Sequence, residues 1–260
     1  MTNAPQPLHG KAAIVSGAAR GIGLAIATQL AADGADVLAL DLPGSALADC
    51  VAAVQAHGRR CIPYEGSVAL SADWERAVAL AQSSFGKLDI LVNNAGIAGA
   101  ISSIGEYPEA VFDQVMAVNV RGVFLGIKHG AKAMLPRGGA IVNIASISGL
   151  SGSRFTMAYT ASKHAVIGMT KVAALEYARQ GIRVNAVCPA PTATEMVYGL
   201  ERAIAPDDPE SFRERFSASI PFGRYGEPAE IAAVVAFLAG PQASFMTGAA
   251  VSVDGGMLAA

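Results

Sequence analysis

The sequence predicts an α/β fold built on one doubly wound parallel sheet of about seven strands, with helices on both faces. Short runs rich in Leu and β-branched residues alternate with longer helical patterns along all 260 residues. Such alternation is typical of strand–helix–strand crossovers in a parallel sheet. Most of the runs are almost continuously apolar, as strands covered on both faces are. No linker, composition shift or internal repeat divides the chain, so residues 1–260 are predicted to form a single domain.

Short apolar runs mark the strands, and the stretches between them carry helix signals. The predicted strands cover 11–16, 35–41, 60–64, 88–93, 140–145, 182–188 and 250–254. Helices are predicted between them, among others over 45–58, 71–86 and 227–240. Ser71 is expected to cap the second of these helices, and Glu227 and Pro228 to open the third.

Two further helices, predicted over 111–135 and 157–179, are apolar on nearly every face. In the second, small or apolar residues such as Ala165, Val172 and Leu175 leave no polar side. A helix of this kind is buried all round. In a single-domain protein, one of its sides must then meet another subunit. The sequence therefore predicts a homo-oligomer.

The composition argues against several classes of partner. The formal net charge is −2, and no cluster of Lys and Arg offers a footprint for nucleic acid. No apolar run approaches the roughly 18 residues of a membrane span, and the N-terminus lacks the basic start and apolar centre of a secretory signal. Three cysteines without CxxC spacing and four histidines without ligand spacing indicate buried, reduced thiols and no metal site. We therefore expect a soluble cytoplasmic protein that binds neither nucleic acid nor membrane.

A glycine-rich turn, IVSGAARGIGLAI, follows the first predicted strand and opens the first helix. Gly17, Gly21 and Gly23 permit a tight turn and let main-chain N–H groups approach a pyrophosphate at the positive end of that helix. The spacing differs from the GxGxxG fingerprint of dinucleotide sites, so a plain connecting turn is the alternative. Asp41, at the end of the second strand, favours a nucleotide pocket, because a carboxylate there accepts hydrogen bonds from an adenosine ribose.

Tyr159 and Lys163 lie four residues apart in the segment AYTASKHAV and would share one face of a helix. An ammonium beside a phenol stabilises the phenolate and lowers the phenol pKa from its usual value of about 10. Such a pair would serve as a proton donor and acceptor. The alternative is an amphipathic helix with a packed Tyr and a Lys whose head reaches solvent, because this spacing alone is common.

Taken together, the order and spacing of the motifs resemble the short-chain dehydrogenase/reductase family over about residues 8–260. SGAARGIG resembles the family's cofactor turn, with Ser16 where Thr is usual. NNAG follows the fourth strand, VNV carries Asn119, and IASISG places Ser146 thirteen residues before Tyr159. CPAPTAT resembles the segment that holds the nicotinamide carboxamide, and SVDGG resembles the last strand and turn. The resemblance implies a Rossmann-type domain that binds a nicotinamide dinucleotide.

The resemblance also implies the site residues. The catalytic set is Ser146, Tyr159, Lys163 and Asn119. Tyr159 would exchange a proton with the substrate oxygen, which Ser146 would hold. Lys163 would lower the Tyr159 pKa and bind the nicotinamide ribose, and Asn119 would hold a water that relays protons. No metal is required, since the phenol and the hydroxyl polarise the oxygen. The implied cofactor-binding residues are Gly17, Arg20, Gly21, Ile22, Gly23, Asp41, Leu42, Ser67, Val68, Asn94, Ala95, Gly96, Tyr159, Lys163, Pro189, Thr192 and Thr194.

Two departures from the family pattern concern the pocket. Ala190 stands where a glycine usually follows Pro189, so a methyl group would project near the nicotinamide end or the backbone. Ser67 and Val68 stand where Asp-Val is common, so Ser67 would hydrogen-bond the adenine without a charge.

The cofactor is expected to be NAD(H). The carboxylate of Asp41 would repel the 2′-phosphate of NADP, and Leu42 offers that phosphate no positive charge. Arg20 is the opposing feature, because a basic residue just before Gly21 recurs in NADP-binding members of the family.

The segment 195–222 is expected to be a mobile lid over the substrate, because it is long, mixed in polarity and interrupted by prolines. Residues expected to line the pocket are Ile97, Ser148, Leu150, Met157, Pro191, Met196 and Tyr198. Since these are mostly apolar, the expected substrate is a small, mostly neutral ketone or secondary alcohol, cyclic ones included. Arg154 would suit an anionic substrate, but a surface position is the simpler interpretation.

Three functions remain open. An NAD-dependent alcohol dehydrogenase or ketone reductase, a homotetramer by resemblance, is favoured. A 3-oxoacyl carrier-protein reductase would use NADPH and a basic docking patch, and both Asp41 and the sparse lysines count against it. A non-catalytic dinucleotide-binding regulator would have no need of the complete Ser, Asn, Tyr and Lys set.

Overall fold

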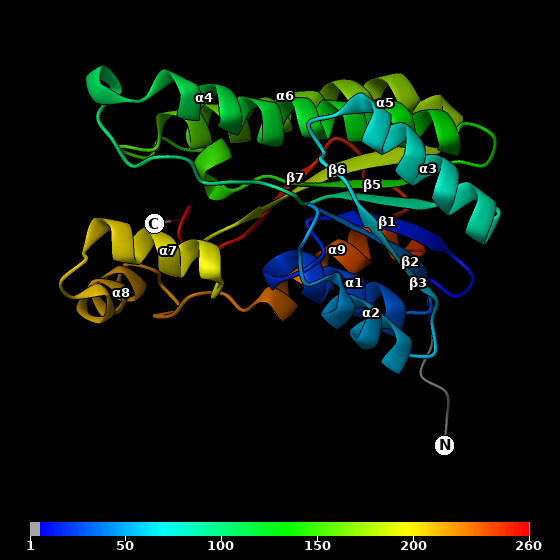
Figure 1. The fold of residues 1–260 in the computed structure, drawn as a ribbon, viewed down its shortest axis with the longest axis horizontal. Coiled ribbons are helices and arrows are strands. Elements are labelled where there is room, and N and C mark those ends of the chain that lie inside the picture. Colours follow the sequence, from blue (N-terminus) through cyan, green and yellow to red (C-terminus); the bar gives the residue numbers. More distant parts are fainter. Residues whose placement is uncertain (1–5, 260) are drawn as a thin grey trace.

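The sheet of the predicted fold is present with every expected strand. The computed structural model describes residues 6–259 and is shown in Figure 1. Its strands pair in the order β3-β2-β1-β4-β5-β6-β7, and every pair is parallel. Their ends lie within two residues of the predicted ones. The strands are β1 (Ala12–Ser16), β2 (Asp36–Asp41), β3 (Cys61–Glu65), β4 (Ile90–Asn93), β5 (Gly139–Ile144), β6 (Ile182–Pro189) and β7 (Ala250–Val253).

Helices cover both faces of the sheet (Figure 1). The α-helices are α1 (Gly21–Ala32), α2 (Leu47–Ala56), α3 (Ser71–Phe85), α4 (Glu109–Val115), α5 (Gly122–Met134), α6 (Met157–Tyr177), α7 (Glu195–Ile204), α8 (Pro209–Ala218) and α9 (Pro228–Ala239). Short turns of other helix types are η1 (Ile104–Glu106), η2 (Met116–Arg121), η3 (Ile147–Gly149), η4 (Ala178–Gln180) and η5 (Pro241–Ala243). Helices α1, α2 and α9 lie on one face, and α3, α5 and α6 on the other.

Two apolar cores result, one on each face of the sheet. Successive residues of β1 contribute to opposite cores: Val15 packs with α1 and α9, whereas Ile14 packs with α3 and α5. The strands are therefore buried on both sides, which explains why their sequences are apolar without alternation.

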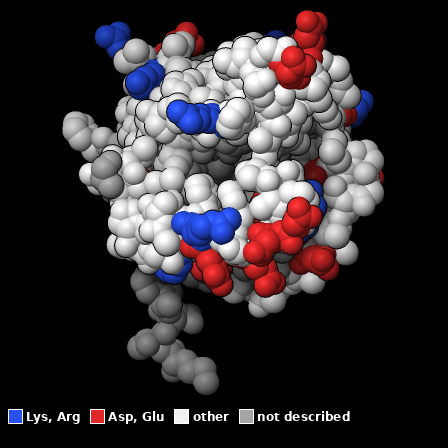
Figure 2. All heavy atoms as spheres, turned by 90° about the vertical axis from the view of Figure 1, so that its left-hand side faces the viewer, with Lys and Arg blue, Asp and Glu red and all other residues white. Residues whose placement is uncertain are grey.

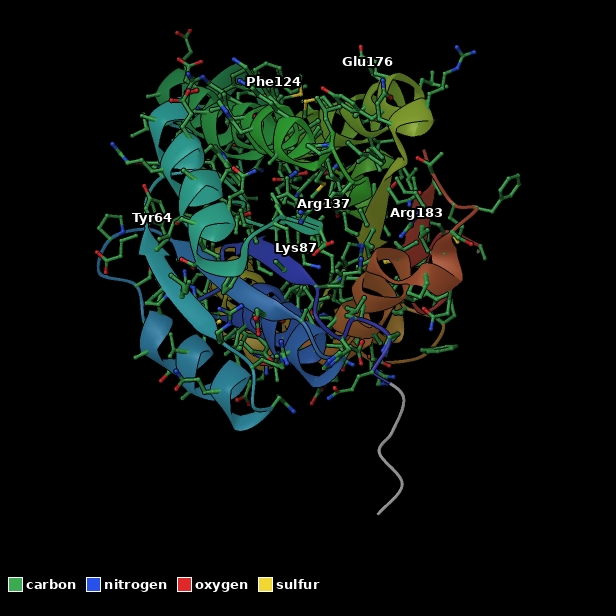
Figure 3. The ribbon with its side chains drawn as sticks, turned by 90° about the vertical axis from the view of Figure 1, so that its right-hand side faces the viewer. Tyr64, Lys87, Phe124, Arg137, Glu176 and Arg183 are labelled. Carbon is green, nitrogen blue, oxygen red and sulfur yellow. The ribbon has the colours of Figure 1, made fainter. Side chains whose placement is uncertain are left out.

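The strand order reverses between β1 and β4, and in an open α/β sheet this point opens a crevice at the carboxyl ends of the strands. The opposite end of the sheet has a structural function. Figure 3 shows Lys87, Arg137 and Arg183 at that end. Arg183, in β6, donates from Nη1 to Leu238 O at 2.7 Å and from Nη2 to Gly240 O at 3.0 Å. A cation there satisfies the last carbonyls of α9 and the negative end of its dipole.

Two helix predictions need correction. Leu70, not Ser71, is the N-cap of α3, and no side chain caps that helix. The Ser71 hydroxyl instead lies 3.0 Å from His129 Nε2 on α5. The region 111–135 is not one regular helix either, because the π-helical turn η2 separates α4 from α5.

The outer faces of the two apolar helices are exposed in the single chain. On α6, Val172 and Leu175 are 56% and 83% exposed, so this helix is not buried all round within one subunit. Figure 3 shows Phe124 of α5 and Glu176 of α6 on this outer layer. By length and composition alone, 109–134 is the one helical stretch among residues 6–259 that would suffice to cross a membrane. Its α5 part packs against the sheet, as a core helix does.

Candidate active site

The glycine-rich turn joins β1 to α1 in the geometry that a pyrophosphate requires. Gly17 and Gly21 adopt φ values of +66° and +56°, which favour glycine, and a Cβ on Gly23 would lie only 1.9 Å from Gly17 O. Arg20, the N-cap of α1, makes no side-chain capping bond, and the first turn holds no acidic residue. The N–H groups of Gly21, Ile22 and Gly23 thus point from a positive helix end with no competing side chain. The donor set fits a dinucleotide pyrophosphate.

Asp41 lies beside this turn and is held there by three hydrogen bonds. Its Oδ2 accepts from Ala19 N–H at 2.9 Å. Its Oδ1 accepts from Leu42 N–H at 2.8 Å and from the Ser45 hydroxyl at 3.1 Å. The carboxylate is therefore fixed at the end of β2, while Arg20 is exposed. A ribose hydroxyl pair suits this acceptor.

The segment after β3 is organised by Asp73. This buried carboxylate accepts from Ser67 N–H at 2.8 Å, and that hydrogen bond, with Arg76 alongside, holds the Asp73 pKa below its usual value. The Ser67 hydroxyl oxygen accepts from Ala69 N–H at 3.3 Å. Val68 is buried beneath it, packed in the core. The Ser67 hydroxyl keeps its proton and one lone pair for an adenine.

Ser16 joins the NNAG segment to the glycine turn. Its hydroxyl accepts from Asn94 N–H at 3.0 Å and from Ala95 N–H at 3.1 Å. In return, Asn94 Nδ2 donates to Ser16 O at 2.9 Å and Gly17 O at 3.1 Å. The sequence did not predict these hydrogen bonds of the Ser16 hydroxyl. It indicated only that Ser16 occupies a position where Thr is usual.

The proposed catalytic residues meet at the carboxyl end of β5. Ser146 caps the turn η3, accepting from Ser148 N–H at 3.1 Å, and its hydroxyl lies beside the phenol of Tyr159. Lys163 is buried one helical turn further along α6, with its Nζ 5.4 Å from the centroid of the Tyr159 ring. That Nζ donates to Ile144 O at 2.8 Å.

The electrostatics of this pair differ from the expectation. Burial raises the pKa of Tyr159, and the neighbouring Ser146 hydroxyl offsets only part of that rise. Burial also lowers the Lys163 pKa to about 8. The sequence predicted that Lys163 would lower the Tyr159 pKa. In the chain itself, loss of solvent dominates instead, because it disfavours the charged form of each group.

Asn119 lies in the π-helical turn η2, and its side chain makes three hydrogen bonds. Its Oδ1 accepts from Ile97 N–H at 2.9 Å. Its Nδ2 donates to Ile97 O at 2.9 Å and to the Ser162 hydroxyl at 3.0 Å. Single π turns inside helices occur frequently at functional sites. The side-chain oxygen accepts a single bond and so keeps one lone pair for the expected water.

The segment 188–194, which is expected to hold the nicotinamide carboxamide, lies against the glycine turn. Thr194 is the N-cap of α7, and its methyl group lies 3.3 Å from where a Cβ on Gly21 would be. Thr192 is buried and its hydroxyl donates to Ala190 O at 2.9 Å. Pro189 ends β6, and Ala190 lines a cavity of about 100 Å³ together with residues that include Phe222 and Asp254.

Figure 2 faces the carboxyl end of the sheet and shows a hollow there. The segment 195–222 below it folds into helices α7 and α8. Of the expected pocket residues, Leu150, Met157 and Met196 are exposed apolar side chains, and Ile97, Ser148, Pro191 and Tyr198 are partly buried. The sequence missed Phe155, an exposed residue at φ +65° whose carbonyl accepts from Ser102 N–H at 2.9 Å.

Two segments near the hollow carry more acidic than basic residues. Residues 195–222 carry six carboxylates and three arginines, and residues 97–120 carry three carboxylates and no basic residue. Figure 2 shows acidic side chains gathered below the hollow and a second group above it, with basic side chains also present on both sides. The field at the mouth opposes the approach of an anion. Within the described part of the chain, no cluster of three or more His, Cys, Asp or Glu side chains would hold a metal.

The chain is similar to known oxidoreductases over nearly its whole length. Residues 17–258 match the family model described as enoyl-(acyl carrier protein) reductase. The chain is 38% identical to levodione reductase of Leifsonia aquatica, over 95% of this chain and 94% of that protein. It is 42% identical to 2-(R)-hydroxypropyl-CoM dehydrogenase of Xanthobacter autotrophicus, over 94% and 97% of the two chains. It is 39% identical to cyclohexanol dehydrogenase of Acinetobacter sp., over 95% and 94%.

Solved structures give the same result. The crystal structure of levodione reductase superposes with a TM-score of 0.95 at 37% identity, covering 97% of this chain and 99% of that one. NAD⁺-bound xylitol dehydrogenase has a TM-score of 0.92 at 36% identity, covering 96% and 99%. A variant of actinorhodin polyketide ketoreductase with NADPH has a TM-score of 0.90 at 37% identity, covering 95% and 97%.

Proposed function

The chain belongs to the short-chain dehydrogenase/reductase family and is an oxidoreductase acting on CH–OH groups, and we propose that it transfers hydride between NAD(H) and a small, mostly neutral secondary alcohol or ketone. One observation carries the proposal. The phenol of Tyr159 lies beside the Ser146 hydroxyl at the carboxyl end of the sheet, with Lys163 buried against the same ring.

The chain's own groups supply the proton chemistry. The nicotinamide supplies or accepts the hydride when bound. In reduction, the Tyr159 hydroxyl donates its proton to the carbonyl oxygen, while the Ser146 hydroxyl holds that oxygen and stabilises its developing charge. In oxidation, the phenolate of Tyr159 removes the alcohol proton. Lys163 would contact the ribose hydroxyls and stabilise the phenolate, and Asn119 would hold the relaying water.

NAD(H) is proposed as the cofactor on the basis of Asp41. Its fixed carboxylate suits two ribose hydroxyls and would oppose a phosphate on the same ribose. The remaining contacts follow the predicted set. The glycine turn would bind the pyrophosphate, Ser67 and Val68 the adenine, and Thr192 and Thr194 the carboxamide.

A neutral substrate is proposed from the apolar pocket and the two acidic segments near the hollow. Exposed apolar side chains at Leu150, Met157 and Met196 offer a surface for a small ring or alkyl chain. Cyclohexanol dehydrogenase, a relative, is named for a cyclic alcohol. The carboxylates of those segments disfavour the anionic carrier of a 3-oxoacyl carrier-protein reductase, which is the alternative. A non-catalytic regulator would have no use for the complete catalytic set.

The test is NADH oxidation by the purified protein with a panel of cyclic and linear ketones, and NAD⁺ reduction with the matching alcohols. Turnover with small neutral ketones and none with carrier-linked 3-oxoacyl groups is expected. Turnover restricted to NADPH and carrier-linked substrates would establish the alternative. No turnover with any of them, together with tight NADH binding, would indicate the regulator.

We also propose a homotetramer, in which each subunit is one domain in the cytoplasm. The chain exposes two separate apolar surfaces. One includes Phe124, Val172 and Leu175 on α5 and α6, and the other Phe237 of α9 and Phe245 before β7. Two different self-complementary interfaces generate a tetramer with D₂ symmetry.

Light scattering tests this assembly. Leu175→Glu and Phe245→Glu should each reduce the tetramer to a dimer, because each removes one interface. A wild-type protein that is monomeric at micromolar concentration would contradict the proposal.

A further inference from the structure

The two helices of the segment 195–222 are joined by an ion pair whose carboxylate is buried and whose guanidinium is partly exposed. In α7 and α8, Glu201 is the one fully buried residue, at 1% exposure. Arg213 of α8 donates to Glu201 Oε2 from both Nε and Nη2, at 2.9 and 2.7 Å. Because a buried charge must stay paired, this carboxylate sets the position of α8 against α7.

The ion pair of Glu201 and Arg213 also contacts a residue expected to line the substrate pocket. The Arg213 guanidinium carbon lies 4.4 Å above the ring of Tyr198, one of the residues expected to line the substrate pocket. Tyr198 and Glu201 are three residues apart on α7, so their side chains neighbour each other along the helix. A change at Glu201 therefore reaches Tyr198 through Arg213.

Aromatic contacts connect α8 to the segment before α9. Phe212 stacks on Phe216 with ring centroids 5.6 Å apart, and Phe216 meets Tyr225 edge-on at 6.1 Å. The Tyr225 hydroxyl is buried beside Glu201, and this burial and the neighbouring carboxylate both raise the Tyr225 pKa. Tyr225 thus stays a protonated donor.

Two buried polar atoms of this cluster, one donor and one acceptor, lack a hydrogen-bond partner among the described residues. Within residues 6–259, neither Glu201 Oε1 nor the Tyr225 hydroxyl completes a hydrogen bond of normal geometry. Buried polar atoms are rarely left in this condition, because each loses its hydration without compensation. The Glu201 carboxylate already lies within reach of the Tyr225 hydroxyl, so a small adjustment of geometry would complete a bond between them.

We propose that Glu201 and Tyr225 form a latch: the Tyr225 hydroxyl donates to Glu201 Oε1 when α7 and α8 close over the substrate. Arg213, Glu201 and Tyr225 then link α8, α7 and the segment before α9 in one chain of hydrogen bonds. This inference rests on the proposed function, in which 195–222 is the lid of a ketone site. Both latch residues are positioning residues, since neither touches the reacting atoms.

The latch stabilises only the closed lid, so its loss reduces the closed fraction and with it the apparent affinity for substrate. The chemistry within the closed complex is unchanged. The site for the adenosine half of the cofactor lies on β1, β2 and α1, away from the latch. The expected signature is a raised KM for the ketone with nearly unchanged kcat and NADH affinity.

Two conservative variants test the latch. Glu201→Gln keeps an oxygen for Arg213 but replaces the charged acceptor of the latch by a neutral amide, whose bond to the phenol is weaker, and Tyr225→Phe removes the donor and keeps the ring that contacts Phe216. Each should raise the KM for a ketone about tenfold, since one buried hydrogen bond is at stake, while kcat and the Kd for NADH stay within about twofold. The double variant should be no worse than the more affected single one, because both act on the same bond.

The matched control is Arg202→Ala, which breaks the exposed pair with Glu195 on the same helix and should leave KM unchanged. Wild-type KM in Glu201→Gln or in Tyr225→Phe would overturn the latch. The latch would also be overturned if either variant weakened NADH binding as much as it raised KM, or if it lowered Tm markedly. Such results would indicate damage to the whole fold.

Limited digestion with proteinase K separates the latch from the proposed function. The wild-type protein and Arg202→Ala should resist cleavage in the loop at 205–208 equally, and Glu201→Gln should be cut several times faster. If no ketone is turned over but this difference appears, the proposed function fails and the latch stands. If ketones are turned over and the difference and the KM effect are both absent, the latch alone fails.

Discussion

Replacing Asp41 with Ala tests how this protein chooses between NAD(H) and NADP(H). The carboxylate ends β2 beside the glycine turn, where Ala19 N–H, Leu42 N–H and the Ser45 hydroxyl hold it at 2.9, 2.8 and 3.1 Å. Because these bonds fix its position, it cannot easily swing away from a phosphate on the ribose. The variant removes the charge together with these three hydrogen bonds.

The magnitude follows from the distance between the charges. At about 4 Å and an effective dielectric near 20, two unit negative charges repel by about 4 kcal/mol. Asp41 is partly exposed, so solvent screening reduces this value, and half of it corresponds to roughly a thirtyfold preference. Arg20 is exposed at the N-cap of α1 and offsets part of the repulsion. We therefore expect the wild type to prefer NADH by at least about tenfold in kcat/KM.

The assay compares kcat/KM for NADH and NADPH with one ketone. Asp41→Ala should reduce the ratio of kcat/KM for NADH to kcat/KM for NADPH, mainly by raising kcat/KM for NADPH. The control is Glu65→Gln, an exposed acid in register with Asp41 on β3, which should change the ratio by less than about twofold. Equal kcat/KM for both cofactors in the wild type would refute the reasoning and favour the carrier-protein reductase.

Three further predictions follow from the site and the sheet. Tyr159→Phe should abolish turnover while NADH still binds in a fluorescence titration, and more than a few per cent of wild-type kcat would show that another group transfers the proton. The pH–rate profiles should differ between directions. Oxidation should accelerate with rising pH, because the raised pKa keeps Tyr159 protonated at neutral pH, and reduction should decline above about pH 8, where Lys163 loses its charge; identical profiles would argue against these assignments. Arg183→Met should lower the free energy of unfolding in urea by about 1–2 kcal/mol, since the carbonyls at the end of α9 lose a charged donor, and an unchanged midpoint would contradict that function.

The strands were predictable because their signal is local and strong. Each is an almost continuous apolar run between turns, and burial on both faces of a parallel sheet requires such a run. The motif order was equally informative, because Ser146 and Tyr159 can meet only if β5 and α6 are neighbours. The cap of α3 was less predictable, because Ser71 suits a cap by type but uses its hydroxyl on His129, 58 residues away.

The features that were missed depend on contacts between distant segments. The π turn around Asn119 cannot be read from helical periodicity, because the contacts of that side chain are with Ile97, 22 residues earlier. The pKa of Tyr159 is governed by burial under the whole site and not by the lysine four residues away. Glu201 looks like any surface acid of a polar segment until α8 folds over it.

Gly96 shows how the separate motifs become one site. A Cβ at this position would lie 3.3 Å from Asn119 Oδ1 and 3.7 Å from Lys163 Nζ, so a glycine there lets both side chains approach the loop after β4. Asn119 in turn bonds the Ser162 hydroxyl, which donates to Tyr159 O at 2.7 Å. The loop after β4, the π turn and the first turn of α6 are therefore positioned by one another. Each motif alone is a common local pattern, and the chemistry arises where the switch point of the sheet brings their side chains into contact.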